Sequence, residues 1–161
     1  MAPWPDPFPR GWRMPDMAEL SRYLFLAGAL PFVFLGLAHA LATPRTPVQS
    51  KGLSPRDPAF REAMSQQTFL LTRRTNMWLT WVGFNLSHSL GAVLFGVVVL
   101  LIGRSPASFR AEAGVFLPLA VGVSGLYFAI GLRYWFRTPI LGIALSATCF
   151  VVSWALFVVG G

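Results

Sequence analysis

The stretch MWLTWVGFNLSHSLGAVLFGVVVLLI, residues 77–102, decides the class of fold to which this chain belongs. It contains no Asp, Glu, Lys or Arg. An α-helix rises about 1.5 Å per residue, so about 20 apolar residues cross the hydrocarbon of a bilayer. The stretch therefore predicts one membrane-spanning helix.

Three further apolar runs without charge lie at residues 23–42, 115–132 and 140–159. The chain of 161 residues is 55% hydrophobic and only 12% charged, whereas soluble domains carry about 25% charged residues. A soluble helical protein would need polar faces on these helices, and the runs have almost none. We therefore predict an all-α domain over residues 18–161, a bundle of four transmembrane helices at about 20–42, 76–102, 114–134 and 139–160.

The connections between these spans differ in length. The connection 43–76 begins as a loop rich in proline and glycine, but residues 59–75 contain neither, which predicts an interfacial helix running into the second span. The string RSPASFRAEAG, residues 104–114, predicts a short loop. The turn 133–138 is so short that the third and fourth spans must be antiparallel neighbours.

Residues 1–17 form a separate segment that is rich in proline. Proline removes amide donors and favours an extended backbone, so we interpret this segment as an extended arm. Three aromatic residues, Trp4, Phe8 and Trp12, alternate with the prolines. They either contact a partner subunit, which we favour, or lie in the membrane interface.

The net charge of +7 comes from basic residues that flank the apolar runs. Such flanking charges are typical of a protein held between lipid headgroups, and they form no stripe suited to nucleic acid. We predict headgroup contacts for Arg73, Arg74, Arg133 and Arg137. Lys and Arg number five on the side of the N-terminus and eight on the opposite side. By the positive-inside rule, this bias predicts that both termini are periplasmic.

Small residues recur at helical spacing in three spans, where they let membrane helices approach closely. The predicted packing residues are Gly83, Ser87 and Gly91 in the second span, Gly122 and Gly125 in the third, and Gly142 and Ser146 in the fourth.

The most polar intramembrane stretch is GFNLSHSLGA, residues 83–92, in which Asn85 and His88 share a helix face. Polar side chains rarely face lipid, so both are expected to point into the bundle or a subunit contact. They form either interhelical hydrogen bonds, which we favour, or a ligand site, with a tetrapyrrole or a quinone as possible ligands and neither assured. His39 is the other histidine; helical rise puts it about 10 Å from His88 in depth, which disfavours a shared haem.

No carboxylate lies in any apolar run, which disfavours a transporter with a proton relay. No motif predicts a catalytic residue or a metal site, so an enzymatic activity is not favoured.

Two strings, LTRRTNMWLTWVGFNLSHSLGAVLFG (residues 71–96) and LRYWFRTPILGIAL (residues 132–145), are similar to segments of a family of small bacterial four-helix membrane proteins. The resemblance covers about residues 20–160, with His39 and the SPRDP loop included. It implies the four-helix fold and a location in the bacterial cytoplasmic membrane, but no activity. The proline-rich arm is not typical of that family.

Three functions remain open at this point. The first is an accessory subunit of a larger bacterial membrane complex, respiratory or photosynthetic, that acts by packing against lipids and other subunits. The second is a membrane-embedded binding protein or enzyme for a lipid, quinone or tetrapyrrole that uses His88. The third is a small-solute transporter.

Overall fold

The computed structural model describes residues 16–160 and confirms the all-α fold. The proline-rich arm, with Trp4, Phe8 and Trp12, lies outside the described residues apart from its last two positions. The described chain forms five helices: α1 (Met17–Ala42), α2 (Pro58–Gln66), α3 (Met77–Gly103), α4 (Pro106–Tyr134) and α5 (Arg137–Gly160). All but α2 are long and apolar enough to cross a membrane, as expected of a multi-pass membrane protein.

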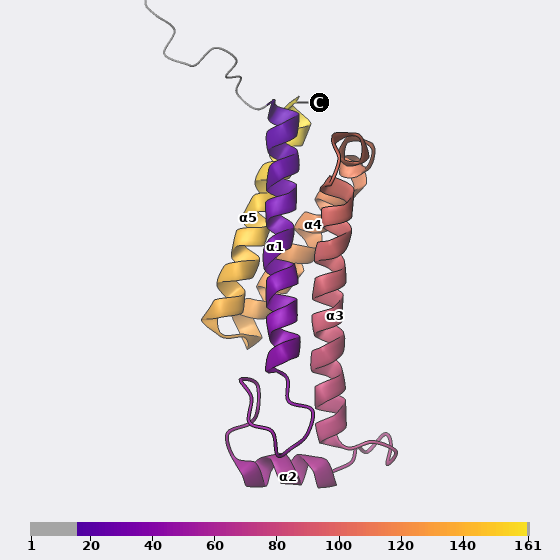
Figure 1. Cartoon of the computed structure of the whole chain (residues 1–161), viewed down its shortest axis with the longest axis vertical. Coiled ribbons are helices and arrows are strands. Elements are labelled where there is room, and N and C mark those ends of the chain that lie inside the picture. The colour runs from indigo at the N-terminus through magenta and orange to yellow at the C-terminus, as the bar shows by residue number, and fades with distance from the viewer. Residues whose placement is uncertain (1–15, 161) are drawn as a thin grey trace, which may run out of the picture.

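The four long helices run side by side, and α2 lies across one end of the bundle (Figure 1). α1 is the central helix, because it packs extensively against both α3 and α5. α4 packs mainly against α5 and touches α3 and α1 much less. The start of α1 and the end of α5 lie at the same end of the bundle, which we call the terminal end (Figure 1). The opposite end, with α2 and the connection between α1 and α3, is called the connection end.

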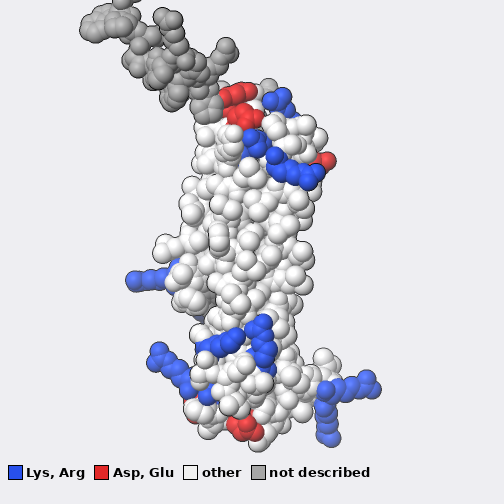
Figure 2. Space-filling view, viewed as in Figure 1, with Lys and Arg blue, Asp and Glu red and all other residues white. Residues whose placement is uncertain are grey.

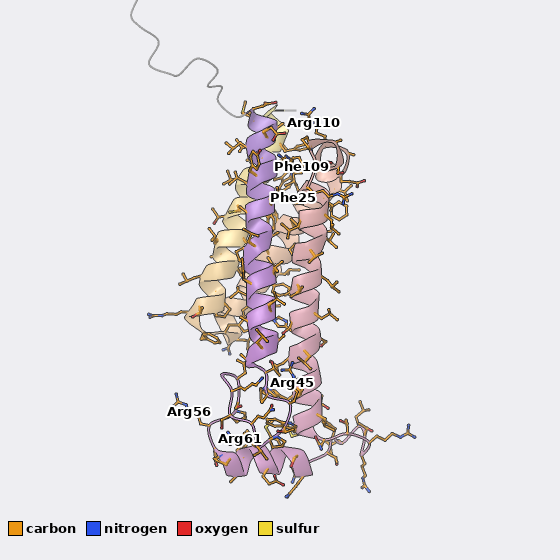
Figure 3. All side chains as sticks on the ribbon, viewed as in Figure 1. Phe25, Arg45, Arg56, Arg61, Phe109 and Arg110 are labelled. Atoms are coloured by element: carbon orange, nitrogen blue, oxygen red, sulfur yellow. The ribbon has the colours of Figure 1, made fainter. Side chains whose placement is uncertain are left out.

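Aromatic rings fill the core near the terminal end. Phe25 of α1 is fully buried, and its ring centroid lies 5.5 Å from that of Phe109 and 5.8 Å from that of Phe150. Figure 3 shows Phe25 and Phe109 facing each other between the helices. In lipid, helix association depends on such close packing, since the surrounding acyl chains are as apolar as the core.

Glycines on the inner faces allow α1 and α3 to approach closely. A Cβ at Gly96 would lie 2.6 Å from the Val33 side chain and 3.0 Å from the carbonyl oxygen of Ala29. A Cβ at Gly36 would lie 3.0 Å from the carbonyl oxygen of Ser89. The sequence analysis did not single out either glycine, although both lie where the two backbones come closest.

The predicted packing stripes of α3 and α4 meet no other helix within residues 16–160. A Cβ at Gly83, Gly91, Gly122 or Gly125 would meet no described atom of another helix within 4 Å, and Ser87 is exposed. α3 instead turns the face with Ser89, Ala92 and Gly96 towards α1, so these stripes do not pack within the chain.

The small residues of α5 lie on its inner face. A Cβ at Gly142 would lie 2.7 Å from the Leu35 side chain, and Ser146 is fully buried.

Two boundaries differ from the prediction because of capping residues. α4 begins at Pro106 instead of near residue 114, since the Ser105 hydroxyl accepts a hydrogen bond from the amide of Ser108 and proline suits the first turn. The interfacial helix ends at Gln66. It cannot run into α3, because Asn76 is extended and its side chain caps α3 by accepting from the amide of Leu79.

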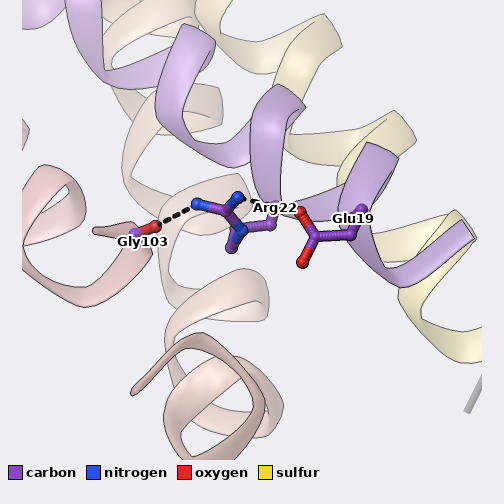
Figure 4. Close-up of polar contacts among 3 residues, drawn as sticks. All are labelled: Glu19, Arg22 and Gly103. Carbon is purple, nitrogen blue, oxygen red and sulfur yellow. Dashed lines mark hydrogen bonds and ion pairs between the residues drawn. The ribbon is translucent and has the colours of Figure 1, made fainter. Parts of the chain in front are cut away.

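Polar side chains fasten the terminal end (Figure 4). Arg22 is 9% exposed; it pairs with Glu19 at 2.8 Å and donates to the carbonyl oxygen of Gly103 at 3.0 Å. The hydroxyls of Ser21 and Ser153, both fully buried, each donate to the backbone carbonyl of the other residue, at 2.8 and 2.7 Å. These bonds tie α1 to the last turn of α3 and to α5.

Candidate functional site

The two histidines, which come from α1 and α3, meet near the connection end. The ring centroids of His39 and His88 are 5.3 Å apart. The expected depth difference of about 10 Å is therefore wrong. It assumed that the two helices end at the same level, whereas α3 begins beyond the end of α1 (Figure 1) and packs its first turns, through Trp78, against Met64 of α2.

Asn85 decides the hydrogen-bonding state of His39. The Asn85 side-chain amide donates to the carbonyl oxygen of Trp81 at 2.7 Å, which leaves its Oδ1 directed at His39 Nε2, 2.8 Å away. Because Oδ1 can only accept, His39 Nε2 carries a hydrogen and donates. This tautomer follows from the network of hydrogen bonds rather than from an observed proton. His39 Nε2 is thus already occupied.

His88, unlike His39, has ring contacts but no hydrogen bond to another residue in the range 16–160. Its half-buried ring lies against Tyr127 of α4 (5.6 Å between centroids, 20° between planes) and against Trp135 at the end of α4 (5.5 Å, 74°). Neither nitrogen of this ring hydrogen-bonds to another residue in the range 16–160. A neutral imidazole carries one donor and one acceptor, so both remain free for another molecule.

These rings line a cavity of about 220 Å³. α1, α3, α4 and α5 all contribute to its wall, and Leu53 of the connection closes one side. No charged side chain from residues 16–160 lines it. The lining residues are Phe32, Leu35, Gly36, Ala38, His39, Ala42, Leu53, His88, Ala92, Tyr127, Trp135, Phe136, Thr138, Pro139 and Ile143.

The cavity reaches the surface beside the turn between α4 and α5. Phe136, one of its walls, is 65% exposed, and Thr138 is also exposed. Arg133 and Arg137 flank this turn and are exposed as well. Since exposed arginines at the end of a span lie at headgroup level, the cavity lies near one membrane interface and not at the midplane.

The connection end is strongly basic (Figure 2). Some of these cations cap α1: Arg45 donates to the carbonyl oxygen of Ala40 at 2.8 Å and Lys51 to that of Leu41 at 3.2 Å, where cations complement the helix dipole. Arg45 lies at the end of α1, and Arg56 and Arg61 lie around α2 (Figure 3). Arg73 and Arg74, for which headgroup contacts are predicted, are exposed.

The site thus brings together all three predicted polar residues, His39, Asn85 and His88. Tyr127 and Trp135 were missed. Trp135 belongs to the RYWFRTP string, but only the packing of α4 against the other helices places it beside His88. No cluster of three or more His, Cys, Asp or Glu side chains suited to a metal ion occurs within residues 16–160.

Comparisons of the chain with protein-family models, with curated proteins and with solved structures found no match.

Proposed function

We propose that this multi-pass membrane protein binds a small, uncharged ring molecule taken from the lipid phase. The observation that carries the proposal is the imidazole of His88, which has no hydrogen-bond partner within residues 16–160 and lies against aromatic rings in a cavity that opens beside the α4–α5 turn. A ligand with a polar atom on its edge supplies the missing hydrogen bond.

The size of the cavity selects among the candidate ligands. A volume of about 220 Å³ exceeds the roughly 150 Å³ of an engineered cavity that holds benzene. It lies below the range of about 300–1,000 Å³ typical of sites for larger ligands. One or two fused rings fit in this volume. A haem shared by the two histidines is disfavoured because His39 Nε2 is bound to Asn85.

The test is to identify what the protein retains. The protein is purified in a mild detergent, and bound molecules are extracted and identified by mass spectrometry. Ala38 lines the cavity and is exposed, so Ala38→Trp should block it without disturbing the core. The matched control is Leu37→Trp, which is exposed but outside the lining. We expect a ring compound near one per chain in the native protein and the control, and its loss in Ala38→Trp. Equal retention in both variants would contradict the proposal.

A second proposed function is that of an accessory subunit in a larger complex of the bacterial cytoplasmic membrane. The supporting observation is that the small-residue faces of α3 and α4, with Gly83, Gly91, Gly122 and Gly125, have no neighbour within the described chain. Such faces suit close approach by the helix of another subunit. The resemblance to bacterial four-helix membrane proteins supports the location, and the excess of basic residues at the connection end supports periplasmic termini.

Mild solubilisation followed by size exclusion tests this second function. We expect co-elution with a stoichiometric partner, lost in Gly91→Leu and kept in Val97→Leu, which changes another exposed face of α3. Elution of the native protein alone would rule it out.

A further inference from the structure

The two histidines that line the cavity differ in their hydrogen bonding. Asn85 uses its amide on Trp81 and its Oδ1 on His39, which locks His39 in one tautomer. His88 has no such partner among residues 16–160 and is held only by ring contacts with Tyr127, Trp135 and His39. His39 is therefore part of the wall, and His88 is the group that can hydrogen-bond to a ligand.

The lining restricts the chemistry of that ligand. No Asp, Glu, Lys or Arg of the described residues lines the cavity, so none of them would compensate a charge on the ligand. Six of the fifteen lining residues carry flat rings, among them Phe32, Tyr127 and Trp135, and such rings favour a planar molecule. The molecule must also carry a polar atom on its edge, where His88 can reach it.

The opening of the cavity determines where any chain attached to the ligand ring can lie. The cavity reaches the surface at Phe136 and Thr138, beside the exposed Arg133. A ligand whose ring fills this cavity leaves any longer chain outside the opening. Among uncharged ring molecules of the lipid phase, a quinone or its quinol meets these requirements, because its polar atoms are oxygens on the edge of a planar ring.

We infer that the ligand is a membrane quinone, with one carbonyl oxygen accepting a hydrogen bond from His88 and the ring among Phe32, Tyr127 and Trp135. This inference rests on the proposed binding function and names its ligand class. In the quinol form the ligand hydroxyl donates and His88 accepts, so a neutral imidazole serves both forms.

The test compares two probes of nearly the same shape, menadione (a naphthoquinone) and 2-methylnaphthalene, which lacks the oxygens. Their dissociation constants are measured by equilibrium dialysis between detergent micelles with and without the protein. One hydrogen bond corresponds to about a three- to tenfold preference for menadione in the native protein. We expect His88→Leu to abolish that preference and His88→Gln, which keeps a donor, to retain most of it.

The outcomes separate the inference from the proposed function. If both probes bind equally to the native protein, the quinone assignment is wrong while ring binding stands. If neither binds, both are wrong. A preference that persists in His88→Leu overturns the role of His88.

An infrared measurement needs no variant and covers the case in which His88→Leu does not fold. The carbonyl stretch of ¹³C-labelled menadione should move to lower frequency when it binds the native protein. An unchanged stretch overturns the hydrogen bond.

Discussion

The terminal end and the cavity place polar side chains among apolar helices in opposite ways. At the terminal end, Ser21, Ser153 and Arg22 donate to backbone carbonyls of neighbouring helices, and Arg22 also pairs with Glu19 of its own helix. In the cavity only His39 has such a partner, and His88 has none among the described residues. A polar group that bonds to a neighbouring helix holds the bundle together, whereas one without such a bond beside a cavity is a candidate for binding a ligand.

The two ends also differ in charge. Three basic and three acidic residues of the described chain lie at the terminal end, which therefore has no net charge: Arg22, Arg104, Arg110, Asp16, Glu19 and Glu112. The connection end, with the α4–α5 turn, holds eight basic residues against Asp57 and Glu62, a net charge of +6 (eight minus two). The cavity lies on this basic side, where anionic headgroups are attracted.

The largest loss of stability is expected where α3 packs against α1 at Gly96. Gly96→Val places a side chain against Val33 and the carbonyl oxygen of Ala29, and should destabilise the fold by at least about 2 kcal/mol. Gly91→Val, on an open face of the same helix, is the control and should cost much less. Thermal unfolding in detergent measures both, and equal tolerance would show that α1 and α3 do not depend on this approach.

The next largest loss of stability is expected at the terminal end. Arg22→Met removes the bonds to Glu19 and Gly103, and should lower the free energy of unfolding by about 2 kcal/mol, the value for bonds to a charged group. The exposed Arg104→Met is the control and should change it little. If both variants unfold at the temperature of the native protein, Arg22 does not hold the bundle together.

Ser21 and Ser153 offer a double-mutant cycle at the same end. Each single change to Ala should cost about 1 kcal/mol, and the two losses should nearly add, because each hydroxyl donates to a backbone carbonyl that the other change leaves in place. A double variant that costs much less than the sum would mean that the two hydroxyls depend on each other through their 3.2 Å contact. Ser87→Ala, on the exposed face of α3, serves as the reference.

The smallest loss of stability is expected at the cavity that His39 and His88 line. His39→Leu leaves Asn85 Oδ1 without its partner and should cost about 1 kcal/mol. His88→Leu removes no hydrogen bond within the described chain and should stay within about 0.5 kcal/mol while ligand retention is lost. Unfolding curves and the extracted ligand are measured on the same preparations. A larger loss of stability for His88→Leu than for His39→Leu would mean that His88 holds the helices together, as the polar residues of the terminal end do.

The fold class could be predicted because it depends on length and polarity alone. A helix must hold about 20 apolar residues to cross a bilayer, and the four runs supply them without any contact being known. The polar cluster was predicted in part for the same reason: a polar side chain in lipid must face the protein, so Asn85 and His88 had to point inward.

The packing faces could not be predicted, because helices that are apolar all round carry no signal for which side is buried. Gly91 and Gly96 look equally suited to close packing, yet only Gly96 meets another helix.

The sequence by itself determined that this protein has four helices long and apolar enough to span a membrane and that Asn85 and His88 turn inward. Only the tertiary structure decided how far α3 slides past α1, and that offset brings His88 to His39. It also carried Tyr127 and Trp135 to the same place. The physical reason is that spacing along one helix fixes depth and face only relative to that helix, whereas a site between helices depends on their relative register, which packing alone sets.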